Sequence, residues 1–141
     1  MKKFFVLTSM FVILIAACIP SATTTAVPTE ETASALYQIV KPDGTKFDVT
    51  LEAVKSLPLA SLTVEGKVQE GPKLMDILKL AGITDFVEVT LTGSSAAVTL
   101  TREQVDDNTI LDFSNRGTMK LATTYIPKAK WTKDITEIVV K

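Results

Sequence analysis

The sequence predicts an α+β domain with a mixed, mostly antiparallel sheet and short helices. Short segments in which apolar residues alternate with polar ones outnumber the segments with helical periodicity. Glycine, proline, asparagine and aspartate separate these segments at close intervals, as is typical of hairpin turns. The chain has 141 residues, which is enough for one domain of ordinary size.

Five elements are expected in the first half of the domain. They are a strand (36–40), a strand (47–51), a helix (50–57), a strand (59–68) and a helix (70–83). The first two strands flank Pro42 and Asp43-Gly44, which favour a tight turn. Thr50 is a suitable N-cap for the first helix, and Pro58 is expected to end it.

The helix expected over 70–83 has the clearest pattern of these elements. Its apolar residues recur from Leu74 to Ala81 at i, i+3, i+4 and i+7, which places them on one face. Pro72 suits a first helical turn, where its missing N–H has no consequence. Gly82 suits the left-handed residue that follows a helix.

The second half of the domain is expected to consist mainly of hairpins. Its elements are a hairpin (86–100), a short helix (101–105), a strand (109–113), a turn (114–117), a strand (118–122) and a final strand (135–140). Thr101 and Gln104 have the spacing of a capping box at the start of the short helix.

The N-terminus has the pattern of a lipoprotein signal peptide. Lys2 and Lys3 precede an apolar segment, 4–17, which is shorter than the roughly 20 residues that span a bilayer. The segment ends in "IAAC", which resembles a bacterial lipobox. We therefore expect 1–17 to be a signal peptide and Cys18 to carry acyl chains that anchor the protein in a membrane. The alternative is an ordinary secretory signal followed by an incidental cysteine.

Residues 18–35 are expected to form a lipidated, flexible tether. They contain two prolines, many threonine and alanine residues and no aromatic residue, so they have little apolar surface to bury. The folded domain is then expected over 36–141. Together these assignments place the protein in the bacterial cell envelope, facing outside the cytoplasm.

Composition excludes several classes of function. The formal net charge is −1, from 15 basic and 16 acidic residues, which argues against a nucleic-acid partner. The chain has no histidine, so a Ser–His–Asp triad is excluded. It has one cysteine, so an internal disulfide is impossible. We identify no catalytic residue and no metal site.

The segment "PKAKWTK" contains the main candidate for ligand binding. Lys128, Lys130 and Lys133 surround Trp131, so their ammonium groups could bind an anion while the indole stacks on a flat ring. Arg116, on its glycine-containing turn, could add a bidentate contact. The alternative is that Trp131 packs inward and the basic side chains are only solvated.

Several segments follow one another in a characteristic order: "VTLEAVKSLP", "LTVEG", "GPKLMDILKLAGI", "VTLTG", "LTREQVDDNTILDF" and "KWTKDITEIVVK". This order resembles that of the oxidoreductase molybdopterin-binding domain, the fold of sulfite oxidase and its bacterial relatives. The resemblance covers about residues 46–141, and Lys130-Trp131 correspond to the closing "K-W" of the family.

The resemblance implies a molybdopterin cofactor, but this chain departs from the family at the metal site. In the enzymes, a cysteine in the loop after the first core strand binds molybdenum, whereas the corresponding loop here, 65–72, has none. Oxygen ligands do not replace a soft thiolate with equal affinity. The arginine of the family's pterin-binding loop is also missing from 122–130.

Three functions remain open from the sequence. The favoured one is a non-catalytic, membrane-anchored binding or accessory module for a small anionic ligand or an envelope protein. The alternative is a molybdopterin-dependent oxidoreductase with an atypical metal site. The third is a structural envelope protein without a small ligand.

Overall fold

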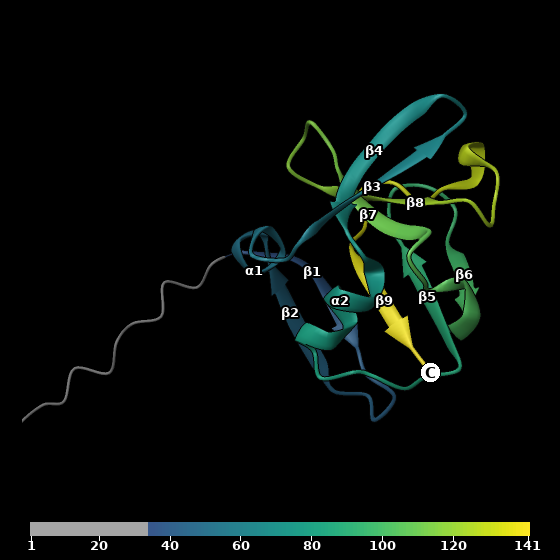
Figure 1. Ribbon diagram of the computed structural model, residues 1–141. Coiled ribbons are helices and arrows are strands. Elements are labelled where there is room, and N and C mark those ends of the chain that lie inside the picture. The colour runs from purple at the N-terminus through teal and green to yellow at the C-terminus, as the bar shows by residue number, and fades with distance from the viewer. Residues whose placement is uncertain (1–33) are drawn as a thin grey trace, which may run out of the picture.

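The main sheet of the domain contains five strands in the order β2-β1-β9-β5-β6. In this computed structural model, which describes residues 34–141, β1 and β9 pair in parallel and the other neighbours in the sheet are antiparallel. Figure 1 shows β9 near the centre of the sheet. The predicted α+β class with mostly antiparallel strands is therefore confirmed.

The strands are β1 (Ala35–Val40), β2 (Lys46–Thr50), β3 (Leu59–Val64), β4 (Lys67–Pro72), β5 (Glu88–Thr92), β6 (Val98–Thr101), β7 (Thr109–Phe113), β8 (Met119–Thr123) and β9 (Glu137–Val140). The helices are α1 (Leu51–Lys55), α2 (Leu74–Leu80) and the single 3₁₀ turns η1 (Arg102–Gln104) and η2 (Lys128–Lys130). The predicted signal peptide, Cys18 and nearly all of the predicted tether lie outside the described residues. Within 34–141, no helix has the length and apolarity needed to cross a bilayer.

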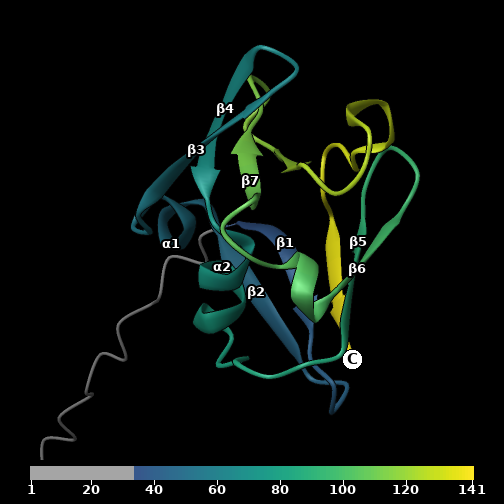
Figure 2. The same ribbon diagram turned by 45° about the vertical axis from the view of Figure 1, so that its right-hand side comes forward.

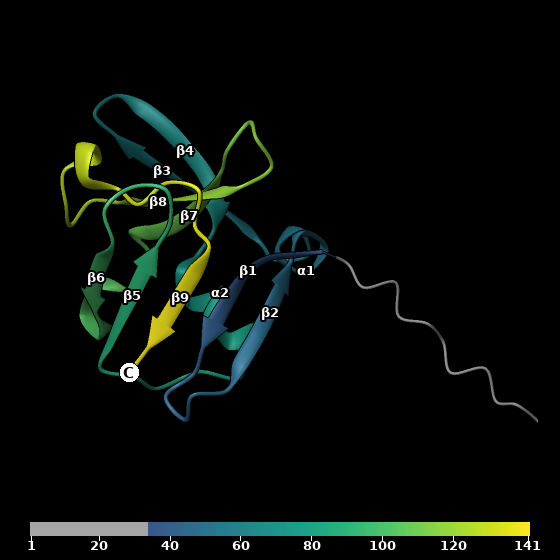
Figure 3. The same ribbon diagram turned by 180° about the vertical axis from the view of Figure 1, so that it is seen from behind.

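One face of the main sheet is covered and the other faces solvent. The inward side chains of β1, β5 and β9, such as Ile39, Leu91 and Ile138, are fully buried. They pack with Leu74, Ile77 and other residues of α2 in the main core. Figure 3 shows the sheet from the side that α2 does not cover. This alternation follows from the two-residue period of a strand.

The hairpin β7–β8 contributes to two cores at once. Leu111 and Leu121 belong to the main core, whereas Ile110 and Ala122 pack with Leu62 and Trp131 in a second, smaller cluster. Successive strand residues point to opposite faces, so each strand of this hairpin supplies both clusters. Figure 2 shows β7 between the β3–β4 hairpin and the main sheet. The hairpin thereby fixes β3–β4 on top of the domain.

Two predicted helix termini are confirmed in detail. The Thr50 side chain accepts a hydrogen bond from the Ala53 amide at 3.2 Å and caps α1. After α2, the amide of Gly82 (φ 76°) donates to the Lys79 carbonyl at 2.9 Å and the amide of Ile83 donates to Leu78 at 3.0 Å. These two bonds form a Schellman motif, which needs a left-handed residue at Gly82. The predicted capping box of Thr101 and Gln104 is also present, although it begins a 3₁₀ turn.

The prediction for residues 59–83 was wrong in two places. The single strand expected over 59–68 is a hairpin, because Glu65 (φ 51°) and Gly66 (φ 72°) reverse the chain in a two-residue turn. The helix expected from residue 70 begins at Leu74 instead. Pro72 ends β4 opposite Leu59, a strand position at which a missing N–H is tolerated.

Gly71 explains why these residues remain extended against β7. A Cβ at this position would lie 1.9 Å from the Leu111 carbonyl oxygen. The backbone of β4 therefore approaches β7 more closely than any side chain would allow. The loop that the family resemblance assigned to 65–72 is consequently a turn and a strand in this chain.

Tyr37 has a buried hydroxyl group that forms no hydrogen bond with any residue of 34–141. Its side chain is 2% exposed, and its hydroxyl has no hydrogen-bond partner within the described part of the chain. Burial raises the pKa of this phenol well above its ordinary value. The hydroxyl therefore loses its bonds to water on folding and gains none in return.

We expect Y37F to raise the free energy of unfolding by about 1 kcal/mol, because it removes the unpaired hydroxyl and keeps the ring. Urea unfolding of the full-length chain in detergent measures this change. Y125F is the matched control, since the Tyr125 hydroxyl donates to Asp106 at 2.6 Å and its removal should not stabilise. Equal effects of the two substitutions would contradict the prediction.

Candidate functional site

Several turns meet at one end of the domain. Figures 1 and 3 show the tip of β3–β4, the turn between β7 and β8, and the segment that carries η2 at the end opposite the C-terminus. The turn between β5 and β6 reaches the same end. Loops held by a rigid sheet are frequent places for binding residues.

The largest hollow at this end is a pocket that we call the lysine pocket. Its volume is about 420 Å³, within the range of small-ligand sites. Its lining residues are Glu65, Lys120, Pro127, Lys128, Ala129, Trp131 and Lys133. Three lysines and one glutamate therefore line this pocket together with apolar residues.

A second hollow of about 220 Å³, the arginine pocket, adjoins the first. It is lined by Ser114, Asn115, Arg116, Lys120, Lys133 and Asp134. Lys120 and Lys133 line both pockets, so the two hollows share a wall. Together they present four cationic side chains.

Trp131 is a buried residue that lines the lysine pocket. The residue is 2% exposed and packs in the second core cluster, and its indole N–H donates to the Ile126 carbonyl at 3.3 Å. The ammonium of Lys128 lies 5.7 Å from the centre of the ring, a cation–π distance. The indole is therefore too covered to stack on a flat ligand, which corrects that expectation, and it holds Lys128 in place instead.

The segment that joins Trp131 to β9 is fixed by the turn between β5 and β6. The amide of Ser94 donates to the Lys133 carbonyl at 2.8 Å, and the amide of Lys133 donates to the Ser95 hydroxyl at 2.9 Å. The Ser95 hydroxyl donates to the Trp131 carbonyl at 3.2 Å, and Thr132 donates to the Ala96 carbonyl at 3.0 Å. These bonds set the position of Lys133 in the shared wall.

Two of the four cationic side chains already have acidic neighbours. Lys120 forms a salt bridge with Asp112 at 2.9 Å, and Arg116 lies 3.9 Å from Asp134. Lys128 and Lys133 form no salt bridge with any residue of 34–141. Their ammonium groups are therefore available to an anion that enters the lysine pocket.

Both pockets contain an acidic residue with a left-handed backbone. Glu65 has φ 51° and Asp134 has φ 46°, and among the described residues they are the non-glycine residues with positive φ. Such a conformation costs of the order of 1 kcal/mol and tends to occur at functional sites. In Asp134 this conformation is maintained by two hydroxyl donors to the carboxylate, Thr118 at 2.6 Å and Ser94 at 2.7 Å. The same two hydrogen bonds hold the pKa of the Asp134 carboxyl below its ordinary value.

The structure brings together only part of the predicted binding set. Lys128 and Trp131 line the lysine pocket, and Arg116 lines the adjoining arginine pocket. Lys130 is exposed and lines neither pocket. Lys120 was missed, because it lies on β8, far from the "PKAKWTK" segment, and nothing in its local sequence distinguishes it from a solvated strand lysine.

The residues of the site do not fit a molybdenum centre. The lining of the lysine pocket contains nitrogen and carboxylate groups but no thiolate, and the chain's single cysteine is Cys18. Over residues 34–141, no three histidine, cysteine, aspartate or glutamate residues are grouped as a metal site. A soft metal would lack the sulfur ligand that it prefers.

Comparisons with known proteins leave the site to be interpreted from its own geometry. No protein-family model matches the chain, and no curated protein matches it.

We expect G93A to lower the free energy of unfolding by about 3 kcal/mol, because a Cβ at this position would lie 2.2 Å from the Lys133 carbonyl oxygen. Thermal and urea unfolding measure the loss. G44A is the control: Gly44 has φ 82° with open space around it, so alanine there should cost only about 1 kcal/mol. A G93A loss no larger than that of G44A would show that the close approach is unimportant.

Proposed function

We propose that this protein is a lipid-anchored, extracytoplasmic binding protein whose domain captures a small anionic ligand in the lysine pocket without catalysing a reaction. The observation that carries the proposal is that Lys128 and Lys133, which form no salt bridge within the described part of the chain, line a pocket of about 420 Å³ together with apolar residues. A charged ligand gains hydrogen bonds from the lysines and buries its carbon skeleton against Pro127 and Ala129.

The geometry supports binding more than chemistry. General acid–base catalysis needs a group that accepts or donates a proton near neutral pH, and the chain has no histidine. The carboxyl of Asp134 has a pKa below its ordinary value, so this group is ionised at neutral pH and is a poor base. Lysines that hold an anion and an apolar wall that holds its body are sufficient for a receptor.

A sulfite-oxidase-like fold is part of this proposal. The order of the segments, with a short helix before the β3–β4 hairpin, the α2 helix and the closing Lys130-Trp131, supports a distant relationship with the molybdopterin-binding domain. The bound molecule would then differ from the cofactor of those enzymes, because the lining residues do not fit its metal. A common scaffold does not require a common activity.

The cell-envelope location rests on the N-terminal sequence. Lys2, Lys3, the apolar segment and the "IAAC" motif support lipidation at Cys18. The Thr- and Pro-containing residues 18–35 would then hold the binding domain away from the membrane. The pocket would face the medium from which an envelope protein collects its ligand.

We expect K128M and K133M each to weaken the binding of inorganic phosphate about tenfold, because each removes a charge-assisted hydrogen bond. Isothermal titration of phosphate into the full-length chain in detergent measures the affinity. K130M is the matched control and should change it less than about twofold, since Lys130 lies outside both pockets. No binding by the unmodified chain, or equal effects of all three substitutions, would refute an anion site here.

We expect C18S to abolish acylation and to release the protein from the membrane fraction of bacteria that produce the full chain. One hydroxyl replaces the thiol that would take the diacylglyceryl group, and membrane affinity falls by about 0.8 kcal/mol for each methylene lost. Mass spectrometry of the N-terminal peptide and membrane fractionation give the readouts. An unmodified Cys18 in the wild-type protein would disprove the anchor.

A further inference from the structure

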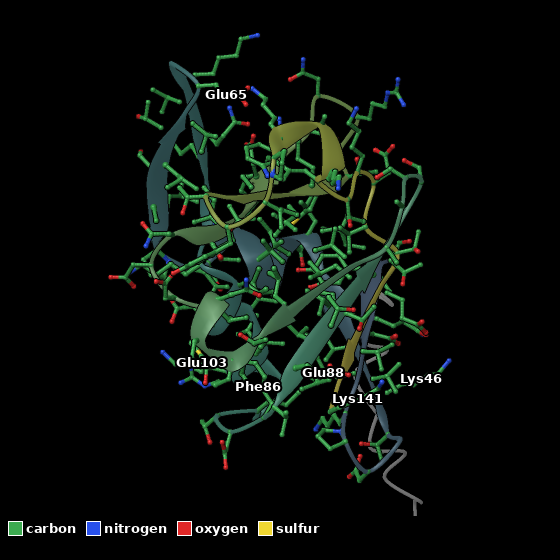
Figure 4. All side chains as sticks on the ribbon, turned by 90° about the vertical axis from the view of Figure 1, so that its right-hand side faces the viewer. Lys46, Glu65, Phe86, Glu88, Glu103 and Lys141 are labelled. Atoms are coloured by element: carbon green, nitrogen blue, oxygen red, sulfur yellow. The ribbon has the colours of Figure 1, made fainter. Side chains whose placement is uncertain are left out.

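Glu65 is a carboxylate in a pocket of ammonium groups. Glu65 is exposed and is one of the residues that line the lysine pocket, together with Lys120, Lys128 and Lys133. Figure 4 shows Glu65 at the tip of the β3–β4 hairpin, at the same end of the molecule as the η2 segment. Within residues 34–141, Glu65 forms no salt bridge.

A carboxylate in this lining would reduce the affinity of the pocket for a simple anion. Two like charges near water repel each other, which would weaken binding by a few fold. The backbone conformation of Glu65 is also unfavourable, because its φ of 51° is one that asparagine or glycine adopts more readily in a two-residue turn. A ligand would offset the repulsion if it carried a group that a carboxylate binds.

We infer that Glu65 is a specificity-determining residue that accepts a hydrogen bond from a hydroxyl group of the ligand, so that the pocket selects hydroxylated anions such as polyol phosphates. This inference rests on the anion binding proposed above. The lysines would bind the anionic group and Pro127 and Ala129 would contact the carbon chain. Glu65, which reaches the pocket from a different hairpin, would bind the hydroxyl.

A pair of phosphates that differ only in hydroxyl groups tests the inference. Glycerol phosphate and propyl phosphate have the same charge and the same number of carbon atoms, and both are titrated into the full-length chain in detergent. We expect the unmodified protein to bind glycerol phosphate about tenfold more tightly, the value of one hydrogen bond to a charged group. Equal affinities would overturn the inference and leave the proposed anion site intact.

The substitution E65Q separates the two roles of the side chain. It keeps the length of Glu65 and removes its charge, so we expect propyl phosphate to bind about threefold more tightly and glycerol phosphate to bind more weakly. A merely structural role would move both affinities in the same direction, and that result would overturn the inference. If the unmodified chain bound neither phosphate, the anion site itself would be refuted and this inference with it.

E65N provides a control for the strained backbone. Asparagine adopts positive φ more readily than glutamate, so we expect a higher melting temperature together with loss of the preference for glycerol phosphate. The shorter side chain would no longer reach the ligand. A variant that gained stability and kept the tenfold preference would overturn the inference, because selection would then not depend on the Glu65 carboxylate.

Discussion

The lysine and arginine pockets depend on the close approach of Gly93 to the segment that follows Trp131. The missing side chain at Gly93 lets its backbone reach the Lys133 and Asp134 carbonyl oxygens. Backbone and hydroxyl groups of the same turn then bond to residues 131–133. On the other side of this segment, the Thr132 carbonyl accepts a hydrogen bond from the Leu121 amide, and the Ile135 amide donates one to the Met119 carbonyl. Hydrogen bonds therefore hold this irregular segment from both sides.

The segment 131–133 connects the second core cluster to the surface of the pockets. Trp131 is anchored in the second core cluster, and Thr132 is fully buried between the β5–β6 turn and β8. Lys133 is consequently presented to both pockets from a backbone that cannot shift without breaking these bonds. Preorganisation of this kind lowers the entropy cost of binding. The β7–β8 hairpin adds to it, since its two faces join the main core to the cluster under the β3–β4 hairpin.

The chemical character of the pocket supports the proposed binding of an anion more than the binding of a molybdenum centre. Lysine ammonium groups, one carboxylate and apolar carbons recognise charge and shape, whereas a molybdenum centre depends on sulfur ligands. The residues that the resemblance assigned to a metal-binding loop form the turn and second strand of the β3–β4 hairpin, and Glu65 of this turn lines the lysine pocket.

The sequence by itself determined the α+β class, the position of most strands, the N-cap at Thr50 and the end of α2 at Gly82, because these depend on local periodicity and on the conformational preferences of single residues. It also named Lys128 and Arg116 as candidate ligand-binding residues, and each of them lines one of the two pockets. Tertiary structure alone decided that 67–72 is a strand, because the close contact of Gly71 with β7 overrides the local helix-start pattern. It alone placed Lys120 and Glu65 in one pocket with Lys128, since residues from three separate hairpins and turns meet there through packing that no local pattern records.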